Sequence, residues 1–159
     1  MDWTLSEASK QAIAEEATKY PTRRSALMPA LHIAQRQFGW LSEAAIEAVA
    51  KELGVPVADA QGVVTFYTMY RTKPVGRYHI QVCQNLSCSL MGAEGLIGYL
   101  EKKLGVKCGE TSPDGKFTIS RVECLAACGT APVMQVNDTY YEKLTPQKVD
   151  DLVAGWAKS

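Results

Sequence analysis

Two pairs of cysteines are the residues of this chain whose type and spacing could do chemistry. Cys83 and Cys88 form a C-x4-C pair, and Cys124 and Cys128 form a C-x3-C pair. Cysteine thiolates at such spacings bind zinc or hold iron–sulfur clusters. The two pairs therefore predict one metal or cluster site, on the condition that the fold brings them together.

The spacing leaves three interpretations of these cysteines open. A [2Fe-2S] cluster has two irons that each need two terminal thiolates, so wide loops suit it. A single zinc ion remains possible, because both spacings lie at the wide end of the zinc range. The cysteines could also be unligated structural residues. A thioredoxin-like dithiol needs C-x-x-C, and a Rieske centre needs histidines, but His32 and His79 both lie outside the cysteine loops.

The cysteine count argues against a disulfide framework. Five is an odd number, and Met1 to Lys10 lacks the basic and then apolar pattern of a signal peptide. No apolar run reaches the roughly 18 residues of a membrane span. We therefore expect a cytoplasmic protein whose thiols stay reduced. Cys108 is expected to be a packed or half-exposed thiol outside the site.

The charge balance limits the possible partners. The chain of 159 residues carries 17 basic and 17 acidic side chains, so no general field attracts nucleic acid or an anionic membrane. No glycine-rich phosphate loop follows an expected strand, so no primary NADH or FMN site is expected in this chain.

Helical periodicity extends through residues 1–72 and predicts a four-helix bundle. Pro56 suits the first turn of the fourth helix, which should run to about Met69. Three serines stand where caps of the first three helices are expected: Ser6, Ser25 and Ser42.

Residues 73–77 lie in a stretch with proline, glycine and no helical period, and we expect a linker there. A second domain over 78–159 should hold a small mixed sheet covered by helices. Its expected elements, in order, are a strand at 78–82, a helix around 96–104, a strand at 117–122, a hairpin of 133–136 and 139–141, and a final helix opened by Pro146.

These elements would position the cysteines. The first pair follows the first strand, and the stretch "CLAAC" follows the second. If the two strands are parallel neighbours, both pairs emerge at the same edge of the sheet. No lysine or arginine lies inside either loop, so backbone N–H groups would have to stabilise thiolate charge. Small residues that let them approach are Gly92, Gly95, Ala126, Ala127 and Gly129.

Several stretches together resemble a known family. They are "FGWLSEAAIEAVAKELGVP", "VVTFYTMY", "PVGRYHIQVCQNLSCSLMGAEGL", "GETSPDGKFTISRVECLAACGTAPVMQVNDTYY" and "KLTPQKV". In this order they resemble the E subunit of bacterial NADH:quinone oxidoreductase, respiratory complex I, over nearly the whole chain.

The resemblance implies an α+β protein: an N-terminal four-helix bundle and a thioredoxin-like [2Fe-2S] ferredoxin domain. It implies one [2Fe-2S] cluster on Cys83, Cys88, Cys124 and Cys128, and no catalytic residue in this chain. It also implies a cis peptide bond before Pro132.

The implied partner is the FMN- and NADH-binding flavin subunit, and through it other iron–sulfur subunits. The cluster would exchange an electron with FMN, off the main path to quinone, on the cytoplasmic side of the inner membrane. The module is also similar to small subunits of NAD-dependent formate dehydrogenases and NAD-reducing hydrogenases. A hypothesis of another class is a zinc-stapled interaction module with no redox role.

Overall fold

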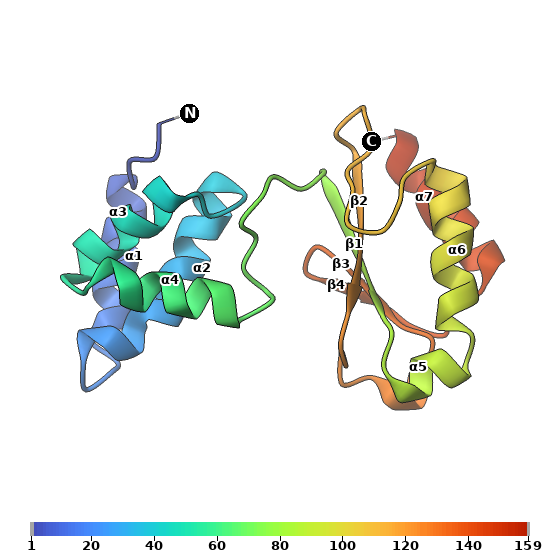
Figure 1. Cartoon of the computed structure of the whole chain (residues 1–159), viewed down its shortest axis with the longest axis horizontal. Helices are drawn as coiled ribbons and strands as arrows, with labels where there is room; N and C mark the ends of the chain where they lie inside the picture. Colours follow the sequence, from blue (N-terminus) through green and yellow to red (C-terminus); the bar gives the residue numbers. More distant parts are fainter. Residues whose placement is uncertain (1, 159) are drawn as a thin grey trace. The chain divides into compact units, whose positions relative to one another are not determined.

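Helices alone build the first part of the chain, and a sheet with covering helices builds the rest (Figure 1). This computed structural model describes residues 2–158. Backbone contacts divide the chain into two compact units between Pro74 and Val75, inside the segment expected as a linker.

The N-terminal unit contains the four expected helices. They are α1 (Glu7–Ala17), α2 (Leu27–Phe38), α3 (Glu43–Leu53) and α4 (Val57–Phe66), with a short 3-10 helix, η1 (Arg23–Ala26), before α2. Ser6 and Ser42 are the N-caps of α1 and α3, where their side chains accept hydrogen bonds from Ser9 N–H and Ala45 N–H.

Two details of the predicted bundle were wrong. Ser25 does not cap α2: it lies inside η1, whose cap is Thr22, and α2 begins without a side-chain cap. The helix α4 ends at Phe66, before Met69. The chain leaves the helix because Gln35 on α2 binds the following segment, donating to Met69 O at 3.1 Å and accepting from Arg71 N–H at 2.7 Å.

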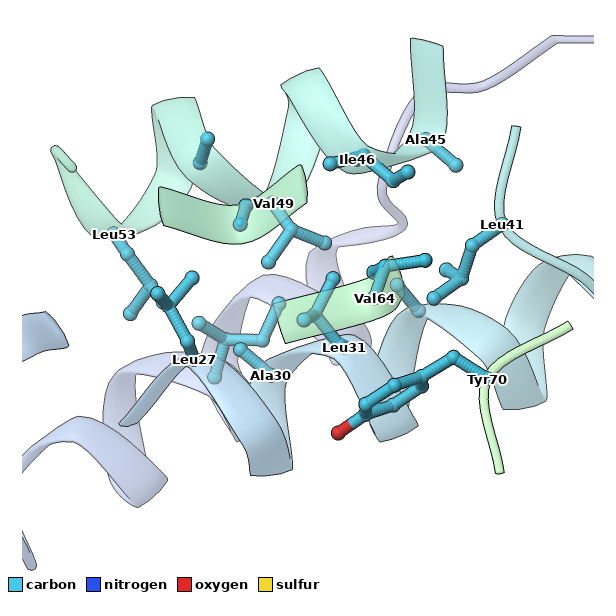
Figure 2. Packing of buried hydrophobic residues seen from close by; sticks show 14 of the residues in the cluster. Leu27, Ala30, Leu31, Leu41, Ala45, Ile46, Val49, Leu53, Val64 and Tyr70 are labelled. Carbon is cyan, nitrogen blue, oxygen red and sulfur yellow. The ribbon is translucent and has the colours of Figure 1, made fainter. Parts of the chain in front are cut away.

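All four helices contribute to the core of this unit, α1 through the buried Ile13. Leu31 of α2, Val49 of α3 and Val64 of α4 point toward one another in Figure 2, and all three are buried. Tyr70 closes one side of the cluster, where its hydroxyl donates to Met28 O at 2.9 Å. A buried hydroxyl without a partner would be costly, and this hydrogen bond removes that cost.

The C-terminal unit is a mixed four-stranded sheet with the order β2-β1-β3-β4. Its strands are β1 (Tyr78–Cys83), β2 (Phe117–Val122), β3 (Met134–Val136) and β4 (Thr139–Tyr141). The pair β1–β2 is parallel, and the pairs β1–β3 and β3–β4 are antiparallel. The strands predicted from alternation, including the hairpin, are confirmed within one residue at their ends.

Helices cover one face of this sheet. The longer ones, α6 (Ala93–Leu104) and α7 (Pro146–Lys158), lie on the same side of it in Figure 1. Ile80, Val82 and Ile119 of the sheet pack in one buried cluster with Leu100 of α6 and Val149 of α7. This cluster fixes the ends of β1 and β2, the strands that lead into the cysteine loops.

Two short elements belong to the cysteine loops themselves. They are α5 (Leu86–Leu90) and the 3-10 turn η2 (Cys128–Thr130). Loops were expected at both places, because stretches this short cannot show a helical period. The peptide bond between Ala131 and Pro132 is cis, as the resemblance implied.

Candidate iron–sulfur site

The parallel pairing of β1 and β2 brings the two cysteine pairs to one edge of the sheet. Cys83 is the last residue of β1 and stands beside Val122, the last residue of β2. Cys88 follows on α5, and Cys124 and Cys128 follow β2. The expected convergence at one edge is therefore present, with the difference that Cys83 ends the strand instead of following it.

The thiols lie in two pairs. Cys124 Sγ and Cys128 Sγ are 3.6 Å apart. The thiol of Cys88 forms a hydrogen bond with that of Cys83, and Cys128, when ionised, raises the pKa of Cys88. Two thiolates at about 2.3 Å from one tetrahedral metal ion stand about 3.8 Å apart, so the spacing of Cys124 and Cys128 suits two thiolates that share an ion.

This paired arrangement fits a binuclear group. Each iron of a [2Fe-2S] cluster takes two protein thiolates, and the site offers one pair from each loop.

The two pairs differ in exposure. Cys83 and Cys88 are each only 2% exposed and pack against Ala93 and Val133, whereas Cys124 and Cys128 are exposed. Burial, and next the hydrogen bond with Cys83, raise the pKa of the Cys88 thiol above its usual range. A cysteine binds a metal ion as the thiolate, so a metal ion that binds Cys88 would release its proton.

Backbone N–H groups approach both pairs. The N–H of Ala126 donates to Cys124 Sγ at 3.3 Å, and the backbone of Val133 makes a hydrogen bond to the Cys88 thiol. Donors of this kind stabilise thiolate charge. Ala126 is one of the small residues that the sequence predicted to bring amides near the sulfurs.

A carboxylate ties the two cysteine loops together. Glu123, next to Cys124, accepts a hydrogen bond at each oxygen: Oε1 from Gln84 Nε2 at 3.2 Å and Oε2 from Asn85 Nδ2 at 3.0 Å. This contact was not expected from the sequence. Nothing in the local pattern pairs residue 123 with residues 84 and 85, and only the register of β1 against β2 indicates it.

The other candidate residues lie elsewhere. Cys108 is half-buried against the sheet-and-helix core, and its backbone N–H donates to Glu101 at 2.9 Å. His79 is buried on β1 with Nε2 2.8 Å from Ser120 Oγ, and His32 lies on α2 in the N-terminal unit. None of the three belongs to the thiol pairs, as expected.

The fold and the site together define a class of protein. A mixed sheet with helices on one face and a cis-proline before β3 carries four thiols at the edge where β1 and β2 end. These are the features of a thioredoxin-like protein adapted to hold an iron–sulfur cluster.

The family model described as thioredoxin-like [2Fe-2S] ferredoxin matches residues 13–157, and the chain belongs to this family. Its members carry a [2Fe-2S] cluster.

Three relatives are named as subunits of NADH-quinone oxidoreductase. The chain is 49% identical over 144 residues to the NADH-quinone oxidoreductase E subunit 2 of Rhizobium meliloti (strain 1021), covering 91% of this chain and 86% of that protein. It is 52% identical over 145 residues to the E subunit of the same enzyme of Rickettsia conorii, covering 89% and 87%. It is 46% identical over 150 residues to NADH-quinone oxidoreductase subunit 2 of Thermus thermophilus, covering 92% and 83%.

A solved structure has the same fold. The NAD+-reducing [NiFe]-hydrogenase in the air-oxidized state matches 83% of this chain with a TM-score of 0.73 and 20% identity, and this chain spans 23% of the matched chain. None of the helices in the described part of the chain is long and apolar enough to span a bilayer.

Proposed function

We propose that this chain is a one-electron carrier of NADH-quinone oxidoreductase that holds one [2Fe-2S] cluster on Cys83, Cys88, Cys124 and Cys128. The observation that carries the proposal is the meeting of two thiol pairs at one sheet edge. Sequence identities of 49% and 52% to subunits of that enzyme, over most of the chain, support the proposal.

Each thiol pair would hold one iron, and the bound cluster would supply reversible one-electron chemistry. The protein shields one pair and leaves the other open. Cys83 and Cys88 are buried with Ala93 and Val133, which excludes water from their side of the site. The exposed pair, Cys124 and Cys128, is where an electron can pass to or from a partner.

The partner we propose is the FMN- and NADH-binding subunit of the same enzyme, and through it the other iron–sulfur subunits. The chain would then contribute no catalytic residue of its own and would act on the cytoplasmic side of the inner membrane. We also propose that residues 1–72 and 78–159 are separate domains joined by 73–77, which the division at Pro74 and Val75 supports.

A second candidate is the equivalent module of an NAD-reducing hydrogenase or an NAD-dependent formate dehydrogenase. The fold likeness to the hydrogenase favours it, but the identity of 20% is far below the 49% to the quinone-linked relative. We therefore rank it second.

Affinity purification of the native complex tests the choice. A tagged chain at its own expression level should bring down a flavin subunit together with membrane-embedded subunits. Recovery with a nickel or molybdenum subunit, and without membrane subunits, would contradict the quinone-linked assignment. Recovery of no flavin subunit at all would contradict both.

A further inference from the structure

The "CLAAC" loop contains a backbone conformation that alanine rarely adopts. Ala126 has φ 60°, in the left-handed region where Cβ crowds the following carbonyl oxygen. Glycine enters this region without that penalty. A non-glycine residue persists there only when its surroundings hold it, and such residues cluster at functional sites.

Ala126 lies between the two cysteines of this loop. Its N–H donates to Cys124 Sγ, two residues back, at 3.3 Å. The left-handed φ that follows this N–H turns the chain toward Cys128, whose Sγ lies 3.6 Å from Cys124 Sγ. The next residue, Ala127, has left that region, with φ −112°. The left-handed turn of this single residue therefore links the donor on Cys124 to the path of the chain toward Cys128, and the donor acts on the exposed pair of thiols.

The loop from Cys124 to Cys128 contains no lysine or arginine, so its own side chains supply no positive charge to this pair. The carboxylate of Glu123 stands directly before it and accepts its hydrogen bonds from Gln84 and Asn85. The backbone donor at Val133 acts on Cys88, in the buried pair.

We propose that Ala126 is a positioning residue that raises the reduction potential of the site through its N–H···S hydrogen bond to Cys124. The inference rests on the proposed function. Adding an electron makes the ligand sulfurs more negative, so a donor that points at one of them stabilises the reduced form more than the oxidised form. The left-handed backbone lets the chain reach Cys128 while this donor stays on Cys124.

The test is a series of three variants of the full chain, each titrated with EPR detection. Ala126→Gly and Ala126→Asn keep the left-handed backbone, because glycine and asparagine tolerate it. Ala126→Val resembles asparagine in size but disfavours that backbone, so the loop between Cys124 and Cys128 should rearrange and lose the N–H···S bond.

At one ambient potential, the ratio of reduced to oxidised protein should fall about tenfold in Ala126→Val, which is about 59 mV for one electron. Ala126→Gly and Ala126→Asn should stay at or above the wild-type potential. A wild-type potential in Ala126→Val, or equal falls in the valine and asparagine variants, would overturn the inference.

Isotope labelling gives a second readout that needs no valine variant. Wild-type protein and Ala126→Gly are both labelled with 15N-glycine, reduced, and compared by pulsed EPR. A 15N coupling found only in the variant places this peptide nitrogen against the cluster, as proposed; identical spectra overturn the inference. Wild-type protein without iron and without an EPR signal would overturn the proposed function as well. If the wild-type signal is normal, a negative result overturns only the inference about Ala126.

Discussion

The four paired cysteines lie in two different environments, and this difference in exposure suggests a different contribution from each pair. Two thiols are buried and two are exposed. In our proposal, the buried pair would help to retain the cluster, since water reaches these thiols poorly. The exposed pair would be accessible to a redox partner. Cys108 would have neither role, although its residue type is the same.

Alanine substitutions should separate ligands from the spare thiol. Cys124→Ala removes a donor from the exposed pair, so the purified variant should contain little iron and give no EPR signal after reduction. Cys108→Ala should keep the wild-type iron and sulfide content, because its thiol packs against the core of the C-terminal unit. Equal losses in both variants would contradict the ligand assignment.

Tyr70 predicts a pH dependence of stability. Burial, and next the charge of Tyr67, raise the pKa of Tyr70 from 10.0 to about 12. The folded state therefore favours the neutral phenol. This contribution to stability is complete below about pH 10 and is lost as the pH rises toward 12.

The matching variant is Tyr70→Phe. At neutral pH it should lower the free energy of unfolding by about 1 kcal/mol, because the hydrogen bond to Met28 is lost. Between pH 10 and 12 its stability should fall less steeply than that of the wild type. Urea unfolding across this range measures both effects, with Tyr20→Phe, an exposed tyrosine, as the control. Parallel curves for wild type and Tyr70→Phe would refute the prediction.

At the scale of elements, the parallel strands and the Glu123 contact set the distance between the cysteine loops. Glu123→Ala removes both hydrogen bonds to Gln84 and Asn85. Together these two exposed hydrogen bonds should stabilise the closed loops by about 1 kcal/mol. Without them, the cluster should be released to a chelator roughly fivefold faster. The decay of visible absorbance measures the rate.

Glu94→Ala is the matched control. Glu94 is also exposed and binds Arg121 through two hydrogen bonds, but it joins α6 to β2 and not the two loops. Its cluster should be released at the wild-type rate. If both variants behave alike, the loops are not held by Glu123.

Gly76 is required where the chain enters β1. A Cβ there would stand 2.8 Å from the backbone atoms Lys116 C and Phe117 N, and backbone cannot move aside easily. Gly76→Ala should therefore lower the free energy of unfolding by about 1–3 kcal/mol. Gly98→Ala, inside α6 with open space around it, should instead raise stability by about 0.5–1 kcal/mol. Denaturant unfolding of both variants checks the opposite signs.

Elements long enough to show a repeating pattern of apolar residues could be predicted from the sequence, and very short elements could not. Alternation identified β1 and β2 because one face of each is buried on helices. The order of strands and helices then placed the two cysteine pairs at one edge. The helix α5 was not predicted because it has only five residues. The predicted α4 was too long because Gln35, far away in sequence, forms hydrogen bonds with the segment after Phe66.

The same distinction holds inside the site. The cysteines and the small residues near them could be identified from spacing. The left-handed backbone of Ala126 and the contact of Glu123 with Gln84 and Asn85 could not, because both depend on how separate loops meet.

At the scale of the whole molecule, the chain combines a helical unit with a cluster-binding unit, and only the second carries the thiol pairs. In our proposal, the chain alone has a redox centre but no binding site for NADH or quinone. Its activity would therefore belong to the complex, which agrees with relatives that are all named as subunits.

The central claim is that the four thiols hold a [2Fe-2S] cluster. Protein purified without oxygen is analysed for iron, sulfide and zinc, and its EPR spectrum is recorded after reduction with dithionite. The account predicts about two irons and two sulfides per chain, no zinc, and a rhombic signal near g = 2. About one zinc per chain, with no sulfide and no EPR signal, would contradict this claim. It would indicate instead an interaction module held together by zinc.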